Sequence, residues 1–123
     1  MEDIYKFTLD NETFEKVLSG KKTIQLVVND SKHKSYAVGN VITFERKSVE
    51  GLDENAVKTI NATIENLLYF ADIKEAVETL GKESCGFKHS ATIEKASDIF
   101  LSTESFEATQ KNGLVALMFK VNE

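Results

Sequence analysis

Two adjacent lysines are the residues of this sequence best placed for chemistry. Lys21 and Lys22 follow Gly20, which lacks a Cβ and suits the left-handed conformation that ends a helix. The helix it would end begins before Phe14 and has one apolar face. A β-branched segment, 23–28, predicts a strand directly afterwards. Two ammonium groups are thus expected at a helix-to-strand junction, either as part of a site or as ordinary solvated lysines.

A thiol and an imidazole lie four positions apart in Cys85 and His89. A zinc site needs three or four ligands, whereas the chain holds one cysteine and two histidines, so the sequence predicts no metal. A nucleophilic cysteine needs a lowered thiol pKa and an orienting third group. We therefore interpret Cys85 as a free structural cysteine. No glycine-rich phosphate loop occurs, and no cofactor is expected.

Charge is distributed unevenly along the chain. The whole sequence carries −5, which argues against a protein that coats nucleic acid through bulk electrostatics. Residues 16–47 hold seven basic and two acidic residues, a charge of +5, so the rest of the chain carries −10. This polarity suits one basic face that binds an anion, although chance clustering gives the same pattern. The basic residues are Lys16, Lys21, Lys22, Lys32, Lys34, Arg46 and Lys47.

Length and composition limit the class of protein. A chain of 123 residues suits one domain with its own hydrophobic core, so we expect a single domain over 1–123. No apolar run approaches the roughly 20 residues of a membrane helix, and we see no secretory signal at the N-terminus. The single cysteine cannot form an internal disulfide. These features predict a cytoplasmic protein without membrane association.

Hydrophobic periodicity predicts the order of the elements. Strands are expected over 4–9, 23–28, 41–46, 57–68 and 114–121, and helices between Asn11 and Gly20, between Asp72 and Gly81, over about 92–100, and as a short turn over 104–110. In the fourth strand, Ile64 and Leu68 share an apolar face with Ile60 and Ala62. The last strand is apolar on both faces and belongs inside the core. Partly segregated strands and helices favour an α+β fold around a curled sheet or small barrel.

Four short motifs carry a resemblance to a known family. They are Phe14-x-x-Val-Leu-Ser-Gly-Lys-Lys-Thr-Ile24, Val38-Gly-Asn-Val-Ile-Thr-Phe44, Leu67-Leu-Tyr-Phe-Ala-Asp-Ile73 and Gly113-Leu-Val-Ala-Leu117. In this order, over nearly the whole chain, they resemble the ASCH domain of the PUA-like superfamily. The resemblance implies a small mixed β-barrel flanked by helices. It also implies an RNA-binding module with a cleft beside the Gly-Lys-Lys-Thr segment.

The same resemblance implies an alternative enzymatic activity. Some small relatives are amidohydrolases that remove the acetyl group from N4-acetylcytidine with a lysine, a threonine and a glutamate. By motif the lysine falls on Lys22, Gln25 stands at the threonine position, and Glu78 or Glu83 takes the place of the glutamate. A glutamine has no nucleophilic atom, but its amide can hydrogen-bond a base or an oxyanion.

The leading hypothesis is therefore a module that binds RNA or a nucleotide-like ligand, mainly through phosphate contacts. The residues assigned to it are Lys21, Lys22, Lys32 and Lys34 for phosphate, Gln25 and Arg46 for a base, and Tyr36 and Tyr69 for stacking. The first alternative is the amidohydrolase, which needs Lys22 desolvated enough to act as a base. The second is a protein-interaction module that uses the acidic half from Asp53 onward. The sequence leaves the ligand, the protein partners and the oligomeric state open.

Overall fold

The structure is a computed structural model that describes residues 5–29, 36–47, 58–88, 90–103 and 110–122. The elements run in the order β1 (Lys6–Leu9), α1 (Asn11–Leu18), β2 (Ile24–Val28), β3 (Val41–Arg46), β4 (Thr59–Phe70), α2 (Ile73–Leu80), α3 (Ile93–Thr103) and β5 (Leu114–Val121). The expected elements are present, and their bounds differ from the predicted ones at the ends only. Of the predicted turn over 104–110, only Gln110 is described, and it is helical. No helix in these ranges is long and apolar enough to cross a membrane.

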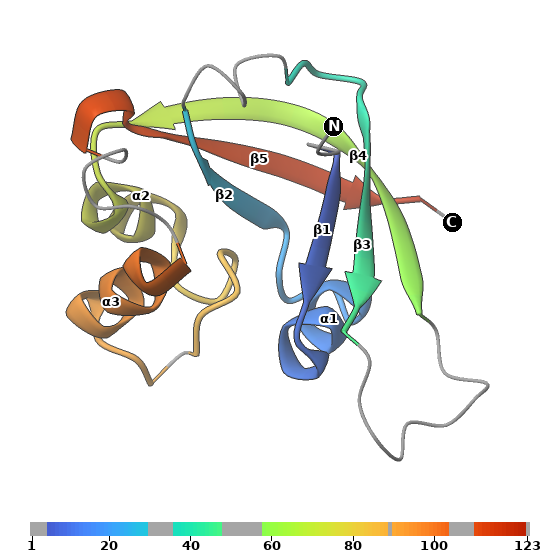
Figure 1. Cartoon of the computed structure of the whole chain (residues 1–123), viewed down its shortest axis with the longest axis horizontal. Coiled ribbons are helices and arrows are strands. Elements are labelled where there is room, and N and C mark those ends of the chain that lie inside the picture. Colours follow the sequence, from blue (N-terminus) through green and yellow to red (C-terminus); the bar gives the residue numbers. More distant parts are fainter. Residues whose placement is uncertain (1–4, 30–35, 48–57, 89, 104–109, 123) are drawn as a thin grey trace.

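The strands form one curled sheet in the order β1-β3-β4-β5-β2 (Figure 1). β1 runs parallel to β3, and every other neighbouring pair is antiparallel. The predicted α+β class and the curled, mixed sheet are confirmed. The sheet forms a half-barrel rather than a closed barrel, because β1 and β2 stand at opposite ends of the strand order and no pairing within the described ranges joins them.

Apolar side chains pack against both faces of the sheet. Phe14 and Val17 of α1 join one cluster, which we call the α1 cluster. α2 and α3 cover a second cluster, the α2–α3 cluster, through residues such as Val77. β5 alternates between the two, since Val115 packs in the α1 cluster and Leu114 in the α2–α3 cluster. The prediction that the last strand lies inside the core is confirmed.

A β-bulge in β4 overturns one predicted orientation. The alternation in the sequence placed Leu68 on the same face as Ile64. The register of β4 against β5 shifts between Ile64 and Asn66, and one extra residue inverts the alternation beyond it. Leu67 therefore packs in the α1 cluster, whereas Leu68 packs in the α2–α3 cluster.

Capping residues set both ends of α1 and the start of α2. The Asp10 side chain accepts a hydrogen bond from the backbone N–H of Thr13 at 2.7 Å and begins α1. Asp72 does the same for α2 through the N–H of Glu75, at 2.8 Å. Gly20 has a φ of +84° just after the C-cap of α1, as the sequence predicted. The chain therefore turns sharply at this point and places the lysines between α1 and β2.

Candidate functional site

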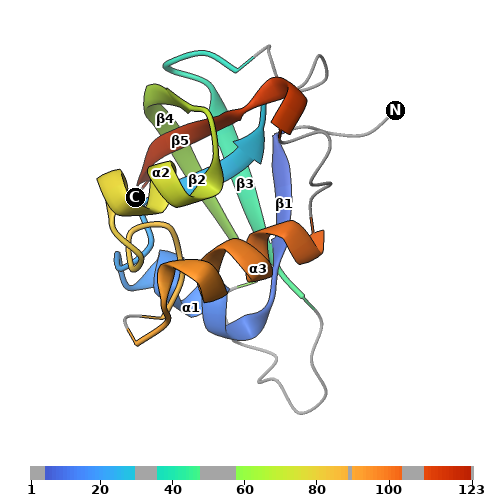
Figure 2. The ribbon, with the colours of Figure 1, turned by 90° about the vertical axis from the view of Figure 1, so that its left-hand side faces the viewer.

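A cavity of about 530 Å³ opens where α1, the start of β2, α3 and the segment before α3 meet. Figures 1 and 2 show α1 and α3 toward the same end of the molecule, and in Figure 1 the segment between α2 and α3 lies between them. The described lining includes Lys16, Lys22, Lys88, Lys95, Asp10, Glu12, Gln25, Cys85, Gly86, Phe87 and Phe100. Lysines outnumber carboxylates in this set, so the cavity is electropositive despite the acidic chain.

The two lysines of the junction have different environments. Lys21 is exposed, whereas Lys22 is only 4% exposed. The Lys22 Nζ donates hydrogen bonds to the carbonyl oxygens of Ile24, at 2.6 Å, and Cys85, at 3.0 Å. The interpretation as ordinary solvated lysines therefore holds for Lys21 and is wrong for Lys22.

Burial changes the titration of the two ionisable groups at this point. It lowers the pKa of Lys22 from 10.5 to about 8, because an ammonium loses hydration there, and the nearby charge of Lys16 acts in the same direction. Burial also raises the pKa of the Cys85 thiol from 9.0 to about 11. Cys85 thus lacks the lowered pKa of a nucleophilic thiol. Its partner in the sequence pattern, His89, lies outside the described residues.

Successive carbonyl groups of residues 84–86 hold the lysine junction in place. The Ser84 oxygen accepts from the backbone N–H groups of Thr23 and Ile24, each at 3.0 Å. The Cys85 carbonyl oxygen accepts a hydrogen bond from the Lys22 Nζ. The Gly86 carbonyl oxygen accepts one from the Lys16 Nζ at 3.2 Å. The segment that contains Cys85 therefore builds the site through its backbone rather than through its thiol.

Gly86 allows the close approach of this segment to Lys22. Its φ is +93°, and a Cβ at this position would lie 2.8 Å from Cδ and 3.1 Å from Nζ of Lys22. A side chain here would both strain the backbone and displace the lysine. Gly86 thus fixes where the ammonium sits.

Gln25 brings an unsatisfied acceptor to the same cavity. In β2, Ile24 and Leu26 pack in the α2–α3 cluster and Val27 in the α1 cluster, so alternation turns Gln25 toward the α1 side. Its Oε1 is buried and accepts no hydrogen bond from any residue that the structure describes. An acceptor left without any partner costs about 1–3 kcal/mol, so a water molecule or a ligand N–H group at this point would stabilise it.

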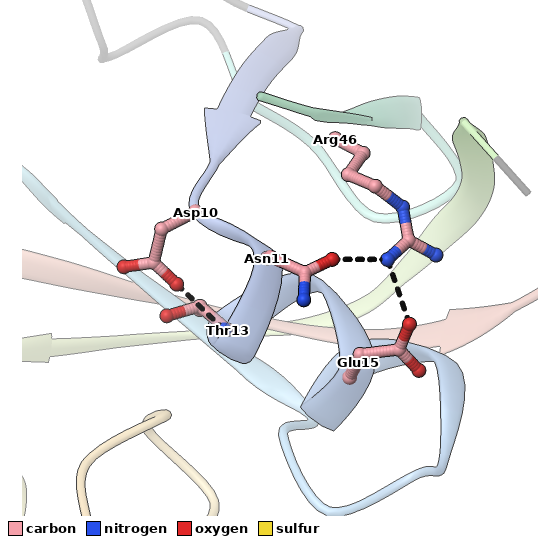
Figure 3. A network of polar contacts seen from close by, with 5 residues as sticks. All are labelled: Asp10, Asn11, Thr13, Glu15 and Arg46. Atoms are coloured by element: carbon pink, nitrogen blue, oxygen red, sulfur yellow. Dashed lines mark hydrogen bonds and ion pairs between the residues drawn. The ribbon is translucent and has the colours of Figure 1, made fainter. Parts of the chain in front are cut away.

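Arg46 lies outside this cavity and serves the fold (Figure 3). Its guanidinium forms an ion pair with Glu15 at 2.7 Å and donates a hydrogen bond to the side chain of Asn11. It also lies 4.4 Å from the centroid of the Phe14 ring. Only 3% of its side chain is exposed, so Arg46 fastens α1 to β3.

The other predicted site residues that the structure describes do not line the cavity. Glu78 and Glu83 are exposed and do not line it. Tyr36 is buried in the α1 cluster, and Tyr69, 62% exposed on β4, does not line the cavity. Lys32 and Lys34 lie outside the described residues. Among the described residues, no group of three or more His, Cys, Asp or Glu side chains could hold a metal ion.

Solved structures that are similar to this chain include the following two. The crystal structure of hypothetical protein PH0355 superposes with a TM-score of 0.74 at 22% identity, over 95% of this chain and 97% of that one. The solution NMR structure of protein PF0455 from Pyrococcus furiosus superposes with a TM-score of 0.72 at 22% identity, over 97% of each chain. The likeness is one of fold. No protein-family model matches this chain, and no curated protein matches it significantly.

Several cavity residues were not predicted from the sequence. Lys16 had a usable signal, because it belongs to the basic stretch and lies in the last turn of α1. Lys88 and Lys95 come from the acidic part of the chain, and no local pattern links them to Lys22. The hydrogen bond from Lys22 to Cys85 spans 63 positions, which periodicity and motif spacing do not reach.

Proposed function

We propose that the protein binds a nucleotide, free or as part of RNA, in the cavity beside Lys22. The observation that carries the proposal is the presence of a buried donor and a buried acceptor in one cavity. An ammonium has three N–H donors, and carbonyl groups of the described chain occupy two of those of Lys22. The Gln25 Oε1 supplies the acceptor. A nucleobase carries acceptors and donors side by side and can satisfy both groups.

The rest of the cavity suits the other parts of a nucleotide. The side chains of Lys16, Lys88 and Lys95 supply positive charge for a phosphate. Phe87 and Phe100 supply apolar and aromatic lining, on which a base or ribose can pack. The volume of about 530 Å³ lies within the roughly 300–1,000 Å³ typical of small-molecule sites.

We further propose that the chain is a cytoplasmic ASCH domain of the PUA-like superfamily. The order of its four motifs supports this assignment, and a curled mixed sheet with flanking helices is compatible with it. The Gly-Lys-Lys-Thr segment, Gly20–Thr23, also borders the cavity through Lys22. The assignment favours RNA or a modified nucleoside as the ligand.

Titration by NMR with a pool of short single-stranded RNAs and with nucleoside 5′-monophosphates tests the binding proposal. Amide shifts should gather in 22–26 and 85–88, and affinity should fall with added salt. Lys22→Met should weaken binding at least about tenfold, in line with a lost charge-assisted hydrogen bond. Lys21→Ala is the matched control, because Lys21 is exposed and does not line the cavity. Equal binding by both variants and the wild type would refute the proposal.

A second candidate function is the hydrolysis of an acylated nucleoside such as N4-acetylcytidine. The pKa of Lys22, lowered to about 8, favours it, since a base near neutrality can take a proton from an attacking water. Water must be the nucleophile because Gln25 has no nucleophilic atom. Hydrolysis should rise with pH through about 8 and vanish in Lys22→Met. A pH-independent rate, or a rate unchanged in that variant, would exclude Lys22 as the base.

A further inference from the structure

We infer that Lys22 and Gln25 together read the Watson–Crick edge of an unpaired base. The inference rests on the proposed function, because it specifies which edge of the nucleotide the cavity accepts. It follows from the hydrogen bonds that each of the two side chains already makes and from the donor or acceptor that each leaves for a ligand.

The direction of the Lys22 donor is fixed by two backbone oxygens. The carbonyl oxygen 2.6 Å from its Nζ belongs to the peptide group that joins Ile24 to Gln25. The second, 3.0 Å away, belongs to Cys85, which also lines the cavity. With two N–H groups held in this way, the third is the one left to a ligand that enters the cavity. Being charged, it selects a strong acceptor such as a base carbonyl or a ring nitrogen.

Gln25 imposes the complementary requirement. Its Oε1 can only accept, so the ligand must present an N–H group to it. The peptide group that accepts from Lys22 is also the one that precedes Gln25, and both side chains line the same cavity. An acceptor adjacent to an N–H donor is the pattern of the Watson–Crick edge of every nucleobase. For a pyrimidine, no other edge carries it.

The burial of both groups adds a condition on the state of the base. Lys22 is 4% exposed and the Gln25 Oε1 is buried, so neither reaches a base that is stacked and paired in a duplex. A paired base has also committed this edge to its partner strand. The site should therefore select free nucleotides and single-stranded RNA, the state in which sequence-specific RNA recognition usually occurs.

A matched set of ligands isolates the edge from the phosphate. Uridine 5′-monophosphate, its 5-methyl derivative and its 3-methyl derivative carry the same phosphate and ribose, and the two methyl groups sit on opposite edges of the base. The 3-methyl group replaces the hydrogen of the N–H group from which the Gln25 Oε1 would accept a hydrogen bond. We expect the 5-methyl compound to bind like the parent and the 3-methyl compound to bind at least about tenfold more weakly, by calorimetry or NMR.

Variants of Gln25 complete the test. Gln25→Leu removes the acceptor, so the discrimination against the 3-methyl compound should fall toward unity, whereas Gln25→Glu keeps an acceptor and should retain it. Equal binding of all three compounds to the wild type would overturn the inference and leave nucleotide binding intact. No binding of these three compounds, of the other nucleoside 5′-monophosphates or of the RNA pool would overturn both. Because the ligand comparison uses the wild-type protein, the test does not depend on the variants folding.

Discussion

The Lys22 ammonium donates a hydrogen bond to the carbonyl oxygen of Cys85, 63 positions further along the chain, at 3.0 Å. This contact joins the junction between α1 and β2 to the segment between α2 and α3. The same ammonium borders the cavity and has a pKa lowered by burial to about 8. The protonation of one residue is therefore linked to the geometry of the site and to the stability of the fold.

The first prediction concerns stability against pH. Above pH 8 the native state releases the Lys22 proton, while the unfolded chain keeps it up to about 10.5, so the unfolded state binds more protons and stability rises. We expect the free energy of unfolding to increase by about 1 kcal/mol between pH 8 and 9. Above pH 9 the Cys85 thiol opposes the rise, because the unfolded chain loses a proton that the native state holds to about 11. Urea unfolding across this pH range measures both effects.

Two variants separate these contributions. Lys22→Met should remove the rise between pH 8 and 9 and leave the decline due to Cys85. Cys85→Ala should keep the rise due to Lys22 and remove the decline due to the thiol, so that stability continues to increase to about pH 10.5, the ordinary pKa of lysine. A rise that survives in Lys22→Met would mean that another group titrates.

The second prediction concerns Gly86. Gly86→Ala should displace Lys22, because the new Cβ would lie 2.8 Å from its Cδ, and the rise in stability between pH 8 and 9 should disappear. The matched control is Gly39→Ala, where φ is +95° and nothing lies within 4 Å. The control should lose only the backbone term, about 1–2 kcal/mol. If both variants lose the same free energy of unfolding and keep the same pH dependence, Gly86 does not position Lys22.

The third prediction concerns Arg46. Replacing it by Ala should lower the free energy of unfolding by about 1–3 kcal/mol, since the Glu15 ion pair and the contact with Phe14 are both lost. Arg46→Lys should recover only part of this loss, because an ammonium lacks the planar fork. Nucleotide affinity should stay unchanged in both variants. A selective loss of affinity in a fully stable variant would return Arg46 to the binding surface.

The fourth prediction is a trade-off at Gln25. Gln25→Leu removes a buried acceptor that has no partner in the described part of the chain, so the free protein should become more stable by about 1 kcal/mol. The same change should weaken nucleotide binding. Chemical denaturation and ligand titration of one sample measure both quantities. Lower stability with unchanged binding would indicate that Gln25 serves the fold alone.

The elements were predictable wherever a local pattern determines them. Asp72 identified the start of α2, and the apolar run of β5 identified an interior strand, because caps and periodicity act within a few residues. The bulge opposite β5 left no such mark, so the orientation of Leu68 was predicted wrongly. Lys22 was found by its place in the motif. The burial of Lys22 could not be predicted from the sequence, because the groups that cover this side chain come from a distant segment of the chain.

The part of β4 beyond the bulge has a consequence for how the fold is lost. There, β4 supplies Leu67 to the α1 cluster and Leu68 to the α2–α3 cluster, and β5 likewise serves both. Neither cluster can come apart while the other keeps these two strands in place. We therefore expect the sheet and the helices packed against it to unfold as one cooperative unit, with the slowest-exchanging amides along β4 and β5 rather than in any of the described helices.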